Sequence, residues 1–376
     1  MKNSQRTTTR LNNKTALSAA MLGVSALLLA GCGAAPEDTA GSDESAEATA
    51  ASIDYTGCIV SDQGGFDDES FNQSSYEGIT AAQENLGIEV RQAESQAETD
   101  FGPNVNSMVT EGCDMIVTVG FLLSATTAEA AEANPDTNFA IVDDNQIELP
   151  NVKPIIYDTA QAAFLAGYTA AGTTETGTVA TYGGIQIPTV TIFMDGFADG
   201  VAYYNEQKDA DVQLLGWDKE AQTGTFTGDF ESLANGKTNT ENFINEGADI
   251  IMPVAGPVGA GTIEAVEEAN ADGADAKVIW VDSDGFLTVN AGNEYILTSV
   301  MKLMGEAVEE VISTDVDDSF DNTPYVGTLE NGGVALAPFH DQEDAVSEEL
   351  MAELEEIEAG IISGDIVVES EASPQQ

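Results

Sequence analysis

Positive charge is scarce in this chain. It has 11 Lys and Arg residues against 66 Asp and Glu, a formal net charge of −55. Four of the bases lie in the first 14 residues, so the chain after residue 31 keeps seven bases and all 66 acids, a formal charge of −59. A surface this acidic repels nucleic acids and anionic headgroups, which excludes partners that bind a basic patch. Because salt screens such self-repulsion, we expect a salt-rich habitat.

Cysteine and histidine are almost absent. The three Cys and one His form no CxxC pair and no set with metal-ligand spacing, so we expect no metal and no cofactor. A serine triad would depend on His340, and the chain has no G-x-S-x-G partner for it. Cys58 and Cys113 each stand near the start of a predicted strand. They could form a disulfide across adjacent strands or remain two buried thiols.

The apolar run at the N-terminus is short. Residues 1–14 carry four bases and no acid, and residues 15–30 are apolar or small, which is typical of a secretory signal and too short for a membrane-spanning helix. The segment that ends at Cys32, Leu-Leu-Ala-Gly-Cys, resembles the bacterial lipobox, whose Cys is acylated and becomes the first mature residue. We therefore expect a signal peptide over 1–31, lipidation of Cys32 and a flexible tether over 32–52, rich in Ala, Ser, Gly and acid.

Short apolar runs alternate with longer amphipathic stretches in the rest of the chain, which predicts parallel sheets built from βαβ units. Predicted strands are Gly57–Ser61, Ile88–Gln92, Met115–Gly120, Phe139–Asp143, Ile155–Tyr157, Thr178–Tyr182, Val212–Gly216, Ile250–Val254, Val278–Val281 and Tyr295–Ser299. Predicted helices are Ser70–Asn85, Asp100–Glu111, Leu123–Asn134, Ile192–Asn205, Thr238–Asn245, Gly259–Ala271 and Val300–Ser313. Later, Tyr325–Leu329 and Gly333–Pro338 look like a hairpin or edge pair, and Glu343–Ser363 looks like an acidic helix.

Two sets of strands predict an α/β protein with two doubly wound lobes. We expect residues 53–157 with about 283–312 in the N-terminal lobe, and 158–282 with about 313–365 in the C-terminal lobe. Residues 366–376 are expected to be a disordered tail. In this architecture ligands lie beyond the carboxyl ends of the strands, so the cleft between the lobes is the expected site.

An ordered set of motifs resembles the Bmp/PnrA-like (basic membrane protein) family of lipoproteins, from about Ile53 to Lys302. The opening motif follows the first predicted strand and runs from Ser61 to Ser74 (SDQGGFDDESFNQS). The others are NPDTNFAIVD from Asn134, FLAGY from Phe164, GADII from Gly247, VAGP from Val254, WVDSD from Trp280 and LTSVMK from Leu297. The family name says basic, whereas this chain is extremely acidic. This difference does not alter the motifs expected to form the pocket.

The resemblance implies a type I periplasmic-binding-protein fold, in which three crossovers join two α/β lobes that close over a ligand. It also implies a nucleoside, with a purine expected, that is delivered to an ABC permease and its ATPase. We accordingly expect a monomer, attached by the lipid on Cys32 to the outer face of the cell membrane, in a periplasm or on a Gram-positive surface. No nucleic-acid partner and no catalytic residue are expected.

A nucleoside needs aromatic faces for its base and acceptors for its ribose hydroxyls. By the family pattern, Phe71 stacks on one face of the base, and Asp62 and Asn72 read its edge. Phe230 is the candidate for the opposite face, with Trp217 and Phe226 as rivals.

The sugar end of the expected site contains three charged residues. Asp143 and Asp282 end predicted strands and look like the ribose acceptors, and Lys302 would reach the 5′-hydroxyl side. Gly256 would offer backbone where a side chain would collide with the sugar. An Asp at a strand end is otherwise often a helix N-cap or turn former, so these roles depend on the surrounding motifs.

Three other functions are compatible with the sequence. The same fold could bind another small solute such as a sugar or an amino acid. The protein could be a surface receptor that senses a ligand and has no transport partner. Paired carboxylates such as Asp143 and Asp282 could in principle hydrolyse a glycosidic bond, which would make the protein a nucleoside hydrolase.

Overall fold

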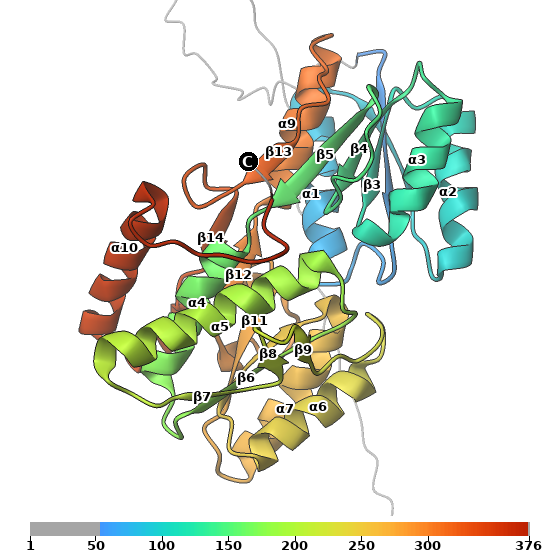
Figure 1. Cartoon of the computed structure of the whole chain (residues 1–376). Coiled ribbons are helices and arrows are strands. Elements are labelled where there is room, and N and C mark those ends of the chain that lie inside the picture. The colour runs from blue at the N-terminus through green and yellow to red at the C-terminus, as the bar shows by residue number, and fades with distance from the viewer. Residues whose placement is uncertain (1–52, 375–376) are drawn as a thin grey trace, which may run out of the picture. The chain divides into compact units, whose positions relative to one another are not determined.

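The computed structural model describes residues 53–374. The predicted signal peptide, Cys32 and the predicted tether up to residue 52 lie outside the described residues. Two six-stranded sheets organise the described part of the chain (Figure 1). In residues 53–374, no helix has both the length and the apolar character needed to cross a membrane.

The first sheet is parallel throughout, in the order β13-β5-β4-β3-β1-β2. Its central strands are buried on both faces because helices cover each side. Alternate residues along β1 therefore join different cores: Ile59 packs on the α1 side, whereas Cys58 and Val60 pack on the α2 and α3 side (Figure 1). The elements are β1 (Thr56–Ser61), α1 (Phe71–Leu86), β2 (Glu89–Ala93), α2 (Glu98–Thr110), β3 (Met115–Val119), α3 (Ser124–Ala133), β4 (Asn138–Val142), β5 (Val152–Tyr157), α9 (Met304–Val316) and β13 (Tyr325–Gly327).

The second sheet has the order β14-β12-β11-β10-β6-β7 and is parallel except for the pairing of β12 with β14. Helices α4 and α5 cover one face, and α6 and α7 cover the other (Figure 1). The elements are α4 (Ala160–Thr173), β6 (Thr178–Gly183), α5 (Pro188–Lys208), β7 (Gln213–Leu215), α6 (Leu233–Asn245), β10 (Ile250–Val254), α7 (Gly259–Ala271), β11 (Lys277–Asp282), α8 (Gly285–Thr288), β12 (Ile296–Lys302), β14 (Val334–Leu336) and α10 (Glu348–Ser363), with a small hairpin of β8 (Trp217–Asp218) and β9 (Thr223–Gly224).

Helices α4 and α5 approach each other closely because glycines line their contact. A Cβ on Gly167 would lie 2.1 Å from the backbone oxygen of Phe197, and a Cβ on Gly200 would lie 2.0 Å from that of Phe164. Real side chains do not come this close, so both positions require glycine. Helix α4 is buried on nearly every side, which is why its sequence has no amphipathic pattern and was not among the predicted helices.

The chain passes between the two sheets three times, between β5 and β6, between β12 and β13, and between β13 and β14. Two predictions about this region need correction. Residues 325–327 and 334–336 lie at sheet edges, as one of the two alternatives had it, but they do not pair with each other, because each adds an edge strand to a different sheet. Strand β12 belongs to the second sheet beside β11, so of residues 283–312 only the α9 part packs with the first lobe, against α1.

The residues after α10 also depart from the prediction of a disordered tail. The backbone oxygen of Glu369 accepts a hydrogen bond from Lys219 Nζ. Ser370 Oγ donates to Asp195 Oδ2 on α5 at 2.6 Å, and Ser373 donates to Asp158 Oδ1, just after β5, at 3.0 Å. This C-terminal segment therefore contacts residues that follow or lie beside both sheets, although its composition is polar and small.

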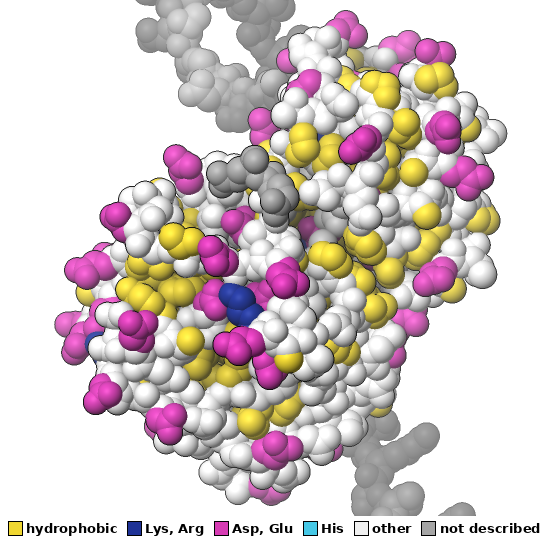
Figure 2. All heavy atoms as spheres, in the orientation of Figure 1, with side chains coloured by type: hydrophobic (Ala, Val, Ile, Leu, Met, Phe, Trp, Pro, Cys, Tyr) yellow, Lys and Arg dark blue, Asp and Glu magenta, His cyan; other side chains and the backbone are white. Residues whose placement is uncertain are grey.

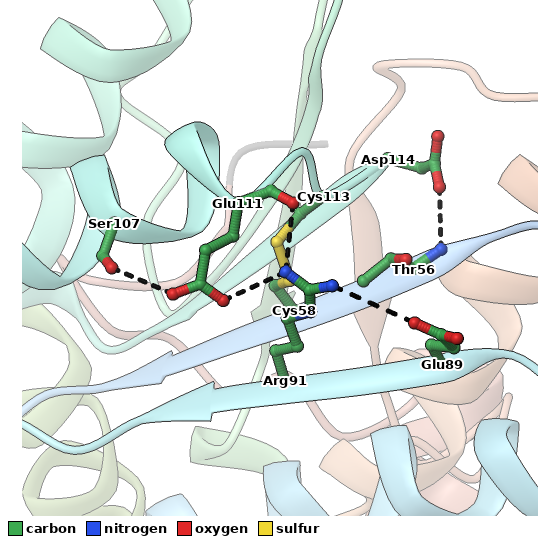
Figure 3. Close-up of a disulfide and its surroundings, with 8 residues drawn as sticks. All are labelled: Thr56, Cys58, Glu89, Arg91, Ser107, Glu111, Cys113 and Asp114. Atoms are coloured by element: carbon green, nitrogen blue, oxygen red, sulfur yellow. Dashed lines mark hydrogen bonds and ion pairs between the residues drawn. A yellow bond between two sulfur atoms is a disulfide. The ribbon is translucent and has the colours of Figure 1, made fainter.

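Cys58 and Cys113 form a disulfide (Figure 3). Their Cα atoms lie 6.0 Å apart because β1 and β3 are neighbours in register, with Gly57 opposite Met115. Both cysteines are buried, at 0% and 5% exposure. Of the two alternatives that the sequence left open, the structure therefore has the disulfide.

Every basic side chain of residues 53–374 is engaged by a carboxylate. Six of the seven pair with acids at or near the surface, and Lys302 pairs inside the molecule. Acidic side chains are spread over the whole visible face in Figure 2, and basic atoms are exposed in few places. The described surface therefore has no unpaired base for an anionic ligand.

Candidate ligand-binding site

One pocket is lined by residues that follow strands of both sheets. All eight residues predicted for the ligand line it: Asp62, Phe71, Asn72, Asp143, Phe230, Gly256, Asp282 and Lys302. They lie at or beyond the carboxyl ends of β1, β4, β10, β11 and β12, at the start of α1 and in the loop before α6. The pocket encloses about 550 Å³ of empty space, counted with its mouth.

Three buried charged side chains that contact one another, Lys302, Asp143 and Asp282, form part of the pocket wall; we call them the charged triad. Lys302 Nζ lies 2.5 Å from Asp143 Oδ2 and 3.4 Å from Asp282 Oδ1, and all three side chains are under one-tenth exposed. Burial alone would lower the pKa of Lys302, but the charges of Asp143 and Asp282 outweigh it and raise the pKa above 10.5. Burial raises the pKa of Asp143, although Lys302 opposes this rise. The triad consists of one basic and two acidic side chains.

The backbone at both aspartates turns their side chains away from the ordinary strand direction. Asp143 has φ 65° and Asp282 has φ 72°, which is the left-handed region that only glycine enters freely. Strain of this kind costs about 1–3 kcal/mol and often occurs at functional sites. Both carboxylates also face the same lysine, which a cap or turn role alone does not require.

A second polar group lies at the start of α1. Asn72 Nδ2 donates to Asp62 Oδ1 at 3.0 Å and to Asp68 Oδ2 at 3.2 Å. Asp68 also accepts from the backbone NH groups of residues 70, 72 and 73, and so fixes the loop before the helix. Burial raises the pKa of Asp62 to about 8 and that of Asp68 to about 6. Asp62 therefore keeps its proton at neutral pH.

Unused acceptors remain in this pocket. Asn72 Oδ1 is buried and has no hydrogen-bond partner among the described residues. Asp282 Oδ1 also makes no hydrogen bond, although it lies at ion-pair distance from Lys302. Buried acceptors without partners are costly, so a ligand with donor groups would be stabilised here.

Aromatic rings surround the charged triad. The ring centres of Phe71 and Phe193 each lie 5.0 Å from Lys302 Nζ. Phe230 lines the pocket, whereas its rivals Trp217 and Phe226 do not. These two pack edge to face at 6.0 Å, and the Trp217 indole donates to Asp195.

Sequence reasoning missed several lining residues. Phe193 and Thr189 come from α5, where the apolar pattern looks like ordinary core, and Phe121 comes from the turn after β3. Gly120 was also missed: with φ 111°, its Cβ would lie 2.1 Å from Asp62 Oδ2, so glycine is required for Asp62 to occupy the pocket. The position of this glycine directly after a buried strand was the one available signal.

Gly256 has φ 53°, which favours glycine. No neighbouring atom lies within 4 Å of the place where its Cβ would be. The pocket is therefore open at this point, and the described protein itself does not explain the glycine through a close contact. The expected contact with a sugar is a prediction that rests on the ligand.

Two largely parallel sheets joined by three crossings, with a polar and aromatic pocket at their strand ends, form a fold of the type I periplasmic-binding-protein class. The structure of an ABC transporter system solute-binding protein from Aeropyrum pernix K1 matches with a TM-score of 0.76 and 26% identity, over 86% of this chain and 94% of that one. A solute-binding protein from Conexibacter woesei has the same fold, with a TM-score of 0.66, 20% identity, and coverage of 85% and 100%.

The sequence model of the family described as "ABC transporter substrate-binding protein PnrA-like" matches residues 56–372, and the chain belongs to this family. The CD4+ T-cell-stimulating antigen of Listeria innocua is 30% identical, over 94% of this chain and 97% of that protein. The ABC transporter nucleoside-binding protein BmpA of Lactococcus lactis is 29% identical, over 84% and 90%. The resemblance seen in the motifs is thus confirmed, and the protein is a substrate-binding protein of the ABC transporter type.

Proposed function

We propose that the protein binds nucleosides outside the cytoplasm and delivers them to an ABC permease. The observation that carries this proposal is the joint presence, in one pocket, of the Asp143–Lys302–Asp282 triad with the rings of Phe71 and Phe230. The Lactococcus relative, whose name states nucleoside binding, supports the same ligand class.

The base would lie between Phe71 and Phe230, because stacking on an aromatic ring contributes about 1–3 kcal/mol per base. Asp62, protonated at neutral pH, would donate to an acceptor on the base edge, and Asn72 Oδ1 would accept from a donor beside it. Such an adjacent pair occurs on the base-pairing edge of purines and pyrimidines alike, and the expectation of a purine rests on the family resemblance.

The ribose would lie against the charged triad. Its hydroxyls would donate to Asp143 and Asp282, and Asp282 Oδ1, which makes no hydrogen bond but lies 3.4 Å from Lys302 Nζ, offers an acceptor for one of them. Hydrogen bonds to charged groups contribute about 1.5–3 kcal/mol each. Lys302 would then face the 5′ side of the sugar.

Capture would follow from closure of the two lobes. A ligand that contacts residues from both sheets binds the closed state more tightly than the open one, and so shifts the population toward closure. The permease would recognise the closed form. We further propose that the protein acts as a monomer tethered through a lipid on Cys32, which lies outside the described residues.

The test is calorimetric titration of residues 53–376, refolded to remove bound ligand, in high salt. Adenosine, guanosine, inosine, uridine and cytidine would be compared with ribose, free bases and amino acids. We expect micromolar or tighter binding of a nucleoside and a loss of about 10- to 100-fold in Asp282→Ala, since one hydrogen bond to a charged group, worth about 1.5–3 kcal/mol, is removed. Asp275→Ala, a change of an exposed carboxylate, is the control and should bind normally.

Each other outcome has a distinct meaning. Binding only to a sugar or an amino acid would retain the transport role and refute the nucleoside assignment. Binding unchanged in Asp282→Ala would refute the site. Release of free base from inosine would favour the hydrolase alternative.

A further inference from the structure

A second cavity adjoins the ligand pocket behind the charged triad. We call it the rear compartment, lined among others by Tyr157, Thr159, Asp144, Ile192 and Glu371. It shares Phe121, Asp143, Thr189 and Lys302 with the ligand pocket, so the two spaces meet along these residues. Its empty space is about 1000 Å³, counted with its open side, against about 550 Å³ for the ligand pocket.

The C-terminal segment closes one side of this compartment. Residues 371–374 line it. The segment is held by Ser370 on Asp195 and by Ser373 on Asp158, at 2.6 and 3.0 Å. The compartment is therefore built partly from the end of the chain, which the composition alone marked as a loose tail.

Two buried hydroxyl groups in its wall have no hydrogen-bond partner among the described residues. They are Tyr157 Oη and Thr159 Oγ1, on side chains that are 4% and 0% exposed. Buried hydroxyls are normally paired, because leaving one unpaired costs about 1–3 kcal/mol. Their position in the wall of a cavity points to a polar partner inside it.

The charge of the compartment selects the kind of partner. Asp143, Asp144 and Glu371 face it, and its one base, Lys302, is already paired with Asp143 and Asp282. Asp144 is 2% exposed and accepts from Ser124 and from the backbone NH of Gln146. An anionic group would meet net negative charge, whereas a neutral or cationic polar group would be stabilised.

We propose that the rear compartment accepts a polar, neutral or positively charged substituent on the 5′ carbon of the bound nucleoside, and rejects a 5′-phosphate. The inference rests on the proposed function, which places the 5′ side of the sugar at Lys302. The hydroxyls of Tyr157 and Thr159 would accept from the substituent, and the carboxylates would balance its charge.

The experiment uses the nucleoside that binds most tightly, together with its 5′-deoxy, 5′-amino-5′-deoxy and 5′-monophosphate derivatives, titrated at pH 7 in one buffer of fixed salt. We expect the amine to bind about tenfold or more tightly than the 5′-deoxy compound, as a charged hydrogen bond is gained. The monophosphate should bind about 100-fold or more weakly than the parent nucleoside.

Tyr157→Phe keeps the ring and removes only the unpaired hydroxyl. It should lower the affinity for the amine about fivefold or more, with a much smaller effect on the 5′-deoxy compound, which lacks a group to fill the compartment. The matched control is Tyr325→Phe, in a ring that packs edge to face on Tyr157 at 6.0 Å but does not line the compartment. It should leave the ratio of the two affinities unchanged.

The results separate this inference from the proposed function. Suppose that the parent nucleoside binds, but the amine binds no more tightly than the 5′-deoxy compound or the monophosphate binds as tightly as the parent. The inference about the rear compartment would then be refuted, and the nucleoside site would stand. If no nucleoside bound, the proposed function and this inference would both be refuted. Thermal unfolding of each variant would confirm that it is folded.

Discussion

Replacement of Lys302 by methionine tests the charged triad directly. Methionine has a similar length and fits an apolar surrounding, so the change removes the charge with little loss of volume. The Lys302 side chain is 3% exposed, and its partners Asp143 and Asp282 are 7% and 9% exposed. The substitution therefore leaves two largely buried carboxylates facing each other without a counter-charge.

Removal of one partner from a buried ion pair costs about 3–5 kcal/mol, and we expect Lys302→Met to destabilise the unliganded protein by this amount at pH 8. The loss should be smaller at pH 5. The pKa of Asp143 is already raised by burial, and it rises further without Lys302. The folded variant then holds a proton that the unfolded chain has lost, so its stability increases as the pH falls toward the unfolded value near 4.

The assay is urea unfolding of residues 53–376 at pH 5 and pH 8 in constant salt, followed by tryptophan fluorescence. Lys277→Met is the matched control: Lys277 pairs at 3.0 Å with Asp275, whose side chain is 66% exposed, so a loss below about 1 kcal/mol is expected. A Lys302→Met variant as stable as wild type at pH 8, or equally destabilised at both pH values, would refute the reasoning about the triad.

Four further predictions concern other parts of the molecule. Asp62→Asn should raise the free energy of unfolding more at pH 9 than at pH 5. The pKa of Asp62 is about 8 in the folded protein and 3.8 in the unfolded chain, so the stability of the wild type falls as the pH rises between these values. Equal differences in urea midpoint between variant and wild type at the two pH values would contradict this prediction. Replacing Cys58 and Cys113 together by Ala should cost about 4 kcal/mol for a 55-residue separation, with reductant then having no further effect. Gly200→Ala should lower the free energy of unfolding by about 1–3 kcal/mol, and so the melting temperature, because its Cβ would collide with α4. Gly102→Ala, with open space around it, should be neutral or stabilising in the same thermal unfolding measurement. The midpoint of unfolding should rise between ~10 mM and ~1 M salt as self-repulsion is screened, and equal stability would refute a salt-adapted surface.

The strands illustrate what local pattern predicts well. The expected segments at Gly57–Ser61, Met115–Gly120 and Ile250–Val254 agree with β1, β3 and β10 to within a residue. Each is a short, continuous apolar run with turn residues at its ends, which is typical of strands buried on both faces. Segments buried all round are harder to predict. Helix α4 has no polar face, and Val300–Ser313 was assigned to one helix although β12 ends at Lys302 and α9 begins at Met304.

The sequence likewise predicted some residues of the candidate site and not others. Asp62, Asp143 and Asp282 were predicted from their place at strand ends and from the motifs around them, and all three line the pocket. Their roles in binding remain predictions. Phe193 could not be found, because a phenylalanine on a helix that packs against a sheet looks the same whether it faces core or ligand.

The sequence by itself determined the acidity, most of the strands and helices, the family and the residues at the strand ends, since these depend on composition and on neighbours along the chain. The tertiary structure decided which strands pair, that Cys58 and Cys113 are bonded, and that β13 and β14 join different sheets. It also decided the raised pKa of Asp62 and the rear compartment closed by the C-terminal segment. These features depend on distances between residues far apart in the chain, and no local pattern of side chains specifies such distances.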